Sequence, residues 1–416
     1  MKLDNMLLIS LVSAMILSGC AKTDDSFLSE NTIENQMSEE TISIVQTETS
    51  TMDSTQLSLL SRCEEITSLY AAFYKQAPRT EPQNQWETPT LSQDSIDTIE
   101  NILLEAGLDV MDTNGEYPSY LKTAENFYAF WEKLQRRQQA TQEVISVSDS
   151  GALSYRLFSN QDGIFKVYSM NYPVGGGDSY YSVQEVLDCG LTDKGNFFYR
   201  VLPAGDKHYA DFSLIRLTAP DLSLYDLTLR YLWPGSYIGA NIFLSDWEEG
   251  SWGNLSFNDL WETIYYDYTG HAFATEGYPY YADQDYYIIP ADEFERVLLP
   301  YFSIDLDTFR LLAHYKEDLG GYPWWPIETN DFVFLYYYTI EPEVTAFREN
   351  DDGTLTLTVE AICTDLKLDC IFAHELTVRP LDDGTFQYVR NRITYKDEEY
   401  GLPFCEPRIT WDPAWS

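Results

Sequence analysis

The last third of the chain has the clearest β pattern. Residues 344–395 read VTAFRENDDGTLTLTVEAICTDLKLDCIFAHELTVRPLDDGTFQYVRNRITY, in which alternating apolar and polar residues are interrupted by polar turns such as Asn350-Asp351-Asp352-Gly353. Alternation places successive side chains on opposite faces of a strand, and polar turns that contain glycine join antiparallel strands. The stretch therefore predicts a four-stranded antiparallel meander with one buried face.

The pairing of the second and third strands of this meander can be predicted as well. A register with Cys363 opposite Cys370 aligns four further pairs: Ala361 with Phe372, Val359 with His374, Leu357 with Leu376, and Leu355 with Val378. All of these residues except His374 are apolar, as a buried sheet face requires. Cys363 and Cys370 then form either a disulfide or two small buried thiols in a reducing setting.

Earlier in the chain, apolar residues recur at helical spacing. They predict helices over 59–73, 96–106 and 120–134, the second with Asp94 as its cap and Gly107 as its stop. After Gln142 the spacing changes to alternation, which predicts a second antiparallel meander. Its strands are expected at 144–147, 152–158 and 164–172, and near 196–202, 209–217 and 224–232.

The predicted fold class is α+β, with N-terminal helices followed by antiparallel meanders. A break in the pattern at 248–254 (EEGSWGN) predicts two α+β domains, residues 57–250 and 255–416. In the second, Ser256 and Asp259 are expected to cap a helix, and Pro290 to begin another whose first turn is acidic. The C-terminal sheet is expected to pack on these helices.

The N-terminus carries an export signal. An apolar run from Met6 to Leu17 is too short to span a bilayer and ends in small residues. Leu17-Ser18-Gly19-Cys20 resembles the lipobox of bacterial lipoproteins, in which the cysteine sulfur receives a diacylglycerol before cleavage on its N-terminal side. Residues 1–19 are therefore a predicted signal peptide, and Cys20 a predicted anchor in the lipid bilayer on the extracytoplasmic face of the cell membrane.

Residues 20–56 differ sharply from the rest of the chain. After Cys20 they contain one aromatic residue, no glycine or proline, and many serine, threonine and acidic side chains. Such a segment cannot bury enough apolar surface to fold. It predicts a disordered acidic linker that separates the folded part from the membrane.

The charge balance excludes one class of partner. The 416 residues include 26 basic and 67 acidic side chains, for a net charge of −41. A chain of this charge repels nucleic acid, so no nucleic-acid partner is expected. Solubility alone explains much of the excess.

Motifs for catalysis and metal binding are incomplete. His374-Glu375-Leu376-Thr377-Val378 begins like the zinc-protease pattern HExxH but lacks the second histidine and falls on a predicted strand. Ser119 and Lys122 have the SxxK spacing without the partner motifs of that enzyme class. No metal, cofactor or catalytic residue is predicted, and His374 is expected to be a hydrogen-bonded core residue.

Two segments pair aromatic residues with carboxylates or prolines. One surrounds Asp283 and Asp285, and the other is Gly320 to Pro326, where prolines favour a loop. Flat rings beside acids suit sugars, prolines or basic groups, although the same rings could simply cap the core. The candidate ligand contacts are Tyr280, Tyr281, Tyr286, Tyr287, Trp324 and Trp325.

Residues 278–305, YPYYADQDYYIIPADEFERVLLPYFSID, and the meander at 344–395 together resemble a known family. It is a family of acidic secreted lipoproteins from anaerobic Gram-positive bacteria, described only as a domain of unknown function. The resemblance covers roughly residues 255–395, and the N-terminal half more loosely. It implies a lipoprotein and brings no catalytic residue with it.

Three functions remain open. The preferred one is a non-enzymatic lipoprotein that binds a cell-wall component, a glycan or a protein partner at the cell envelope. The second is a carbohydrate-active hydrolase, which needs two carboxylates about 5 to 10 Å apart in a cleft. The third is the solute-binding lipoprotein of a transporter, which predicted hairpins disfavour because such proteins usually have parallel α/β lobes.

Overall fold

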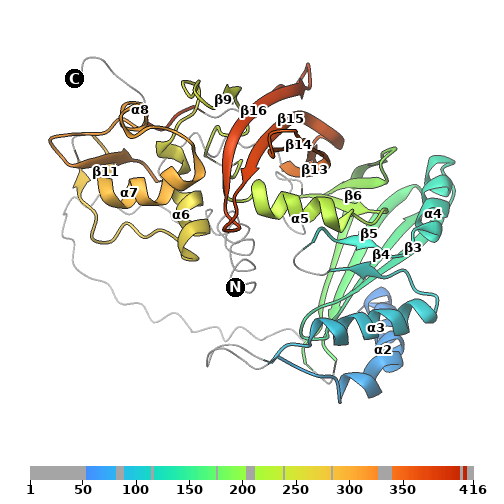
Figure 1. Ribbon diagram of the computed structural model, residues 1–416. Helices are drawn as coiled ribbons and strands as arrows, with labels where there is room; N and C mark the ends of the chain where they lie inside the picture. Colours follow the sequence, from blue (N-terminus) through green and yellow to red (C-terminus); the bar gives the residue numbers. More distant parts are fainter. Residues whose placement is uncertain are drawn as a thin grey trace, which may run out of the picture.

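A computed structural model describes residues 53–409 except 81–88, 114–116, 175–176, 203–210, 238, 283, 327–339 and 403–405. An eight-stranded sheet with three helices is followed by a part that holds a five-stranded sheet, a three-stranded sheet and further helices (Figure 1). The mixed α+β class with mainly antiparallel sheets is thereby confirmed. The predicted signal peptide, Cys20, Cys405 and the linker up to residue 52 lie outside the described residues, while residues 54–56 already belong to the first helix.

The three N-terminal helices are α2 (Ser54–Tyr74), α3 (Gln93–Glu105) and α4 (Glu125–Gln135). The Asp53 carboxylate caps α2 by accepting from the Gln56 N–H at 2.7 Å. The cap of α3 is Ser92 rather than Asp94, and Gly107 follows this helix in the left-handed region that glycine tolerates. Helix α4 begins later than predicted because Tyr120 pairs in a short strand.

The eight-stranded sheet has the order β1-β2-β8-β7-β6-β5-β4-β3. Neighbouring strands in this sheet are antiparallel, except that β2 and β8 are parallel. A parallel bridge between Val110 and Ile145 connects the residue before β1 with β3, so the sheet is strongly curved. Its strands are β1 (Met111–Asp112), β2 (Tyr120–Leu121), β3 (Ala140–Val147), β4 (Leu153–Gln161), β5 (Ile164–Tyr172), β6 (Tyr180–Leu191), β7 (Asn196–Val201) and β8 (Asp211–Arg216).

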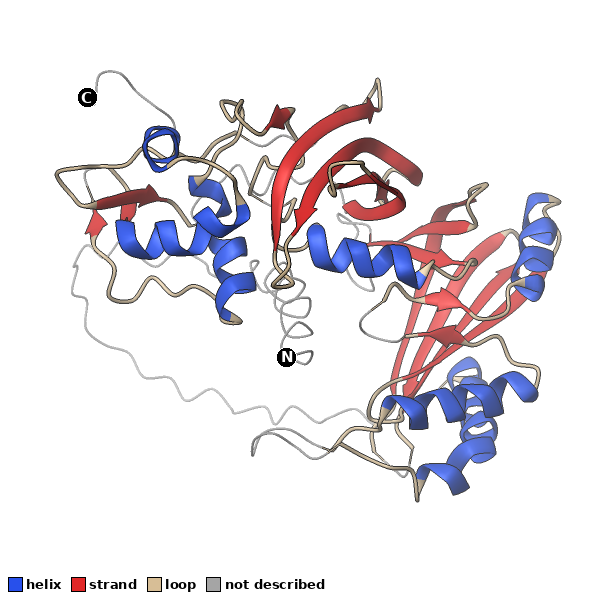
Figure 2. Ribbon diagram, in the orientation of Figure 1, coloured by secondary structure: helices blue, strands red, loops and turns tan. Residues whose placement is uncertain are grey.

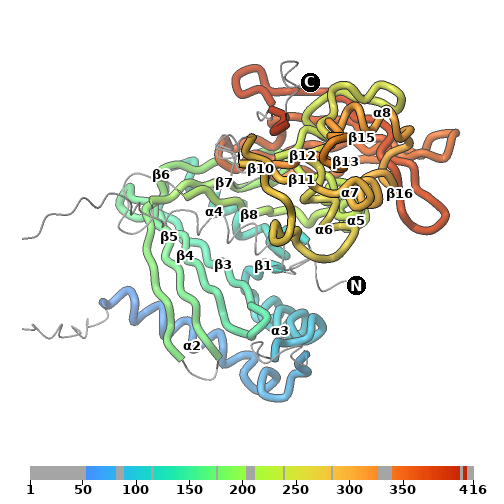
Figure 3. Tube along the Cα trace, turned by 90° about the vertical axis from the view of Figure 1, so that its left-hand side faces the viewer, coloured from blue at the N-terminus to red at the C-terminus, as the bar shows by residue number. Residues whose placement is uncertain are grey.

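Helices cover the two faces of this sheet at different ends. Ile145, Tyr155 and Met170 are buried in one cluster with residues of α2 and α3. Phe158 and Val167 point to the other face, where they are buried with residues of α4. Figure 3 shows α4 beside one end of the long strands, and α2 and α3 beside the other. In the described part of the chain, no helix covers the end of this face that lies farthest from α4.

The C-terminal sheet has five strands, not the predicted four, in the order β13-β14-β15-β16-β9. The meander itself is as predicted, and β9 joins it because Trp247 and Glu248 pair with Asn391 and Arg390. The strands are β9 (Trp247–Glu248), β13 (Ile340–Glu349), β14 (Leu355–Cys363), β15 (Leu368–Pro380) and β16 (Phe386–Lys396).

A helical layer with a small sheet packs beside the meander (Figure 2). Helix α7 begins after Pro290 with Asp292 and Glu293 in its first turn, as predicted. Ser256 caps no helix there, because the chain passes through a 3₁₀ turn before α6. The elements are α6 (Trp261–Thr269), α7 (Ala291–Leu298), α8 (Leu306–Leu312), β10 (Tyr280–Tyr281), β11 (Tyr286–Pro290) and β12 (Gly321–Trp324), with 3₁₀ turns at Asn258–Leu260 and Leu299–Tyr301.

The predicted register between β14 and β15 is confirmed over four pairs, from Leu355 with Val378 to Ala361 with Phe372. It fails at the end of the hairpin, where an irregularity after Ala361 places Cys363 opposite Leu368. Cys363 and Cys370 are free thiols in the structure, so the disulfide interpretation is not supported. Burial raises the pKa of the Cys363 thiol to about 11, as expected for a small apolar core residue.

One predicted strand is a helix. Residues 224–232 fall in α5 (Leu222–Tyr231), whose first N–H groups are capped by the Asp221 carboxylate. Leu224, Leu227 and Tyr231 share a helical face, and all three pack on the C-terminal core. The leucines in LSLYDLTLRY fit the two-residue period of a strand, but the segment follows the 3.6-residue period of a helix.

The core divides earlier in the chain than the predicted boundary at 248–254. Buried residues up to Leu217 form two clusters with the eight-stranded sheet, and those from Tyr231 onward form two others with the C-terminal part. The EEGSWGN segment is part of the second region, because its Trp252 is buried there and its Glu248 pairs in the five-stranded sheet. In the described part of the chain, no helix is both long and apolar enough to cross a membrane.

Candidate functional site

The aromatic segments contribute less surface than predicted. Tyr280 is 50% exposed, but Tyr286 is 9% exposed and Trp324 only 1%. Tyr281, Tyr287 and Trp325 are partly buried. Trp324 is not in a loop, because it ends β12, where it pairs with Tyr287.

Trp324 belongs to the core of the helical layer. Its ring packs edge-on against Phe273, with 4.9 Å between the ring centroids, and its indole N–H has no hydrogen-bond partner among the described residues. The rings of Tyr280 and Tyr287 pack together with 5.0 Å between their centroids. The Tyr280 hydroxyl donates a hydrogen bond to the Asp285 carboxylate at 2.5 Å. The predicted ligand surface therefore reduces to Tyr280 and the edges of its neighbours.

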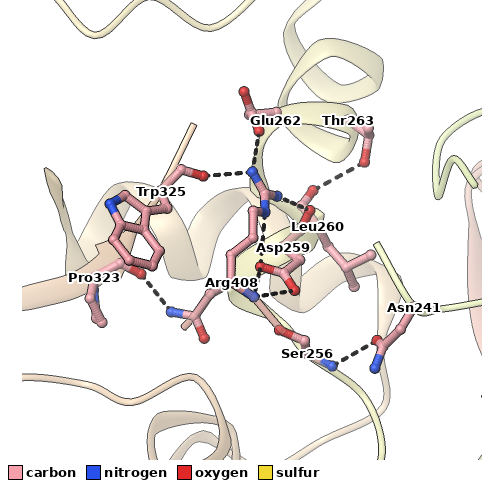
Figure 4. A network of polar contacts seen from close by, with 10 residues as sticks. Asn241, Ser256, Asp259, Leu260, Glu262, Thr263, Pro323, Trp325 and Arg408 are labelled. Carbon is pink, nitrogen blue, oxygen red and sulfur yellow. Dashed lines mark hydrogen bonds and ion pairs between the residues drawn. The ribbon is translucent and has the colours of Figure 1, made fainter. Parts of the chain in front are cut away.

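A buried charge network lies close to this layer (Figure 4). Arg408 Nε donates to Asp259 Oδ1 at 3.1 Å, and its Nη1 donates to Glu262 Oε2 at 2.8 Å and to the Trp325 carbonyl at 2.5 Å. The side chains of Arg408 and Asp259 are each 1% exposed. Burial raises the pKa of Asp259, and the guanidinium of Arg408 opposes that rise. Every contact is internal, so the network fixes the C-terminal segment rather than forming a ligand site.

A pocket lies where the eight-stranded sheet meets the C-terminal sheet. This junction pocket has a volume of about 250 Å³. Its lining is mixed, with two cations, four carboxylates and several apolar side chains from α5, β13 and β14. The charged lining residues are Lys194, Arg216, Asp221, Glu343, Glu360 and Asp369.

Ion pairs across the junction engage these charges. Arg216 Nη2 lies 2.6 Å from Glu343 Oε1, and Lys194 contacts Glu360. Asp369 accepts from Thr192 at 2.8 Å and from Asn196 at 2.7 Å. Burial raises the pKa of Glu343, and the adjacent guanidinium of Arg216 opposes that rise. A carboxylate paired in this way is held by its cation and is poorly placed to transfer a proton to a substrate.

A further pair of salt bridges joins β6 to β7 and to the residue before β15, and it leads to a prediction. Lys367 Nζ and Arg200 Nη2 each lie 2.5 Å from the Asp188 carboxylate. Burial opposes ionisation, but the two cations outweigh it and lower the pKa of Asp188. Asp188→Asn should thus reduce the free energy of unfolding at pH 7 by about 0.5–1 kcal/mol. This difference should begin to shrink below about pH 4, where the unfolded-state carboxyl takes up protons, and should be lost as the pH falls through the lowered pKa of the folded state.

Urea unfolding from pH 7 to pH 3 measures this difference. Glu132→Gln, which removes an exposed pair with Arg136 on α4, is the control and should change stability by less than about 0.5 kcal/mol. An Asp188→Asn effect as large at pH 3 as at pH 7 would contradict an electrostatic origin.

His374 is a hydrogen-bonded core residue, as predicted. Its Nδ1 lies 2.6 Å from the Asn391 amide oxygen, and its Nε2 lies 2.5 Å from the Tyr237 hydroxyl. Asn391 Nδ2 donates to the Ser245 carbonyl, which orients its oxygen toward His374, so Nδ1 carries the proton and Nε2 accepts from tyrosine. Burial lowers the pKa of His374 to about 3. Within the described residues, no group of three or more histidine, cysteine or acidic side chains could hold a metal ion.

The sequence predictions missed the junction charges and Arg408. Lys194, Arg216 and Glu343 come from distant strands, and only the fold brings them together. Arg408 has a weak local signal, as a single cation in a C-terminal segment rich in proline and tryptophan. Its partner Asp259 was assigned to a helix cap instead.

These features define an acidic α+β protein whose two regions meet at a polar pocket. A model of a family of unknown function, DUF6070, matches residues 56–408, which is most of the chain. The chain belongs to this family. No curated protein and no solved structure matches it.

Proposed function

We propose that this protein is a lipoprotein tethered through Cys20 to the outer face of a bacterial cell membrane. The observation that carries the proposal is Leu17-Ser18-Gly19-Cys20 placed directly after a short apolar run. The arrangement of the chain supports it, because the first described helix starts at Ser54 and the family match at residue 56. Two acyl chains on one cysteine suffice for stable anchoring.

We also propose a non-enzymatic binding role at the cell envelope. In the junction pocket, the carboxylates of Glu343 and Glu360 are ion-paired and that of Asp369 accepts two hydrogen bonds. This arrangement supports binding over the paired-carboxylate hydrolase. A transporter subunit gains no support, because the three sheets are antiparallel apart from the pairing of β2 with β8.

The finer family assignment belongs to the same proposal. In this view, the family consists of acidic secreted lipoproteins of anaerobic Gram-positive bacteria. Free thiols at Cys63, Cys189, Cys363 and Cys370 are compatible with a reducing habitat.

Lipid labelling tests the anchor. The chain is produced in a bacterium fed an alkyne fatty acid, and label on the protein is measured in membrane and soluble fractions. We expect Cys20→Ser to abolish the label and to remove the protein from the membrane fraction, because Cys20 is the cysteine directly after the predicted signal peptide. Cys370→Ser, the same change in the folded part, is the control and should keep the label. Label on Cys20→Ser, or none on the unaltered chain, would refute the proposal.

A further inference from the structure

The open part of the α4 face of the eight-stranded sheet is unusual for so acidic a protein. Cross-strand pairing sets Arg156 of β4 beside Ser169 of β5, and Ser169 beside Ser182 of β6. The next row sets Ser154 beside Asn171, and Asn171 beside Tyr180. We call these six residues, Ser154, Arg156, Ser169, Asn171, Tyr180 and Ser182, the Arg156 face.

The side of the sheet on which these residues lie follows from strand alternation. Arg156 precedes Phe158 by two positions and Ser169 follows Val167 by two, and both apolar residues are buried against α4. Tyr155 and Met170, one position away, are buried on the opposite side with α2. The Arg156 face is thus the continuation of the α4 side beyond the helix, where Tyr180 is 67% exposed.

Charge distinguishes this face from the rest of the molecule. On β3 to β6, three acidic residues pair directly across the sheet, and all three lie on the side opposite α4, namely Glu143, Glu185 and Asp188. Glu143 is bound there by Arg62 at 2.9 Å. Among the described residues, Arg156 has no ion pair or hydrogen bond of its side chain, and neither do the serines of the face. The chain has 67 acidic and 26 basic residues, so a surface that carries an unpaired guanidinium and no carboxylate from its strands is exceptional. Such a surface favours binding of an anionic ligand.

The uncharged side chains of the Arg156 face indicate which class of ligand it binds. Serine hydroxyls and the Asn171 amide can each donate and accept, which suits a ligand rich in hydroxyl groups. An exposed tyrosine ring offers a flat surface for a sugar ring. Protein interfaces instead rely on buried apolar anchors, which this face lacks. The three strands that carry the face, β4 to β6, span roughly 10 Å, which is about the length of two sugar units.

We propose that the Arg156 face binds a glycan that carries isolated carboxylate groups. Arg156 would hold one carboxylate with two parallel N–H donors, while the serines and Asn171 bind neighbouring hydroxyls. A densely charged polymer is disfavoured because the net charge of −41 repels it. This inference rests on the proposed binding role and names its ligand class, but it is independent of the lipid anchor.

The test is calorimetric titration of residues 20–416 carrying Cys20→Ser. The probe is a hyaluronan hexasaccharide, in which glucuronate alternates with N-acetylglucosamine, and the neutral probe is the N-acetylglucosamine hexamer. We expect the acidic probe to bind and the neutral one to bind about tenfold or more weakly. Arg156→Gln should weaken binding of the acidic probe by about tenfold or more, as loss of hydrogen bonds to a charged group predicts.

A matched control and a second variant complete the experiment. Lys166→Gln removes the same charge from the α2 side of neighbouring β5 and should leave the affinity within about twofold. Ser169→Asp keeps Arg156 but places a carboxylate beside it, and should also abolish binding. Unchanged circular dichroism and unfolding midpoints establish that both Arg156 face variants fold.

Equal binding of the two probes, no binding of either, or an Arg156→Gln variant that binds as tightly as the unaltered chain would each overturn the inference. None of these outcomes alters the lipid-labelling result. Conversely, a chain that binds the acidic probe through Arg156 but takes no label would refute the anchor alone.

Discussion

Replacing Arg408 by alanine is expected to lower the free energy of unfolding by about 3–5 kcal/mol. The substitution leaves the carboxylate of Asp259 in the core without its cation, where both side chains are only 1% exposed. It also removes the donors to Glu262 and to the Trp325 carbonyl. Breaking one partner of a buried pair costs far more than the pair itself contributes, because an uncompensated charge remains.

Urea unfolding at pH 7 measures this loss. Arg136→Ala, which removes an arginine from an exposed pair on α4, should change stability by less than about 0.5 kcal/mol. The double variant Arg408→Met with Asp259→Leu should recover most of the loss, because no buried charge is left. A single variant as stable as Arg136→Ala would show that the network contributes little to the fold.

Stability is also expected to fall by about 2 kcal/mol between pH 8 and pH 5 because of His374 alone. Its pKa is lowered to about 3 in the folded protein, so the native imidazole stays neutral over this range. The unfolded histidine has its ordinary pKa of about 6.5 and takes up a proton as the pH falls below that value. The unfolded state then binds more protons than the native state, and stability decreases as the pH falls toward 3.

The variant His374→Gln isolates this contribution. A glutamine amide can accept from the Tyr237 hydroxyl and donate to Asn391 without titrating. Between pH 8 and pH 5, the free energy of unfolding of the His374→Gln variant should therefore fall by about 2 kcal/mol less than that of the unaltered chain. His271→Gln, at an exposed position, should keep the original sensitivity. Equal pH dependence of His374→Gln and the unaltered chain would contradict the assignment.

The sequence predicted those elements whose pattern has a single physical interpretation. The β14–β15 register followed from apolar pairing such as Leu357 with Leu376, and the acidic first turn of α7 from Asp292 and Glu293. Prediction from the sequence failed where the same residues fit both the strand period and the helix period. Leu227, Leu229 and Tyr231 alternate well enough for a strand, but the segment forms a helix because Leu224, Leu227 and Tyr231 pack on the C-terminal core.

The candidate site was harder to predict, because burial is a property of the whole fold. Proline next to Trp324 suggested an exposed loop, yet Pro323 pairs in β12 at the edge of a three-stranded sheet. The junction pocket depends on Arg216 and Glu343, which only tertiary structure brings together. Similarly, the Arg156 face requires the strand register, since the composition of β4 alone does not show which side lacks acids.

The position of Arg408 has a consequence for the order of folding. Its contacts with Asp259 join residues 149 positions apart, and β9 pairs with β16 over a similar separation. Contacts of such long range are slow to form, because the loop between them must close first. The C-terminal core therefore cannot be completed until Arg408 has been synthesised. Until then the helical layer lacks Arg408, and Asp259 lacks its cationic partner.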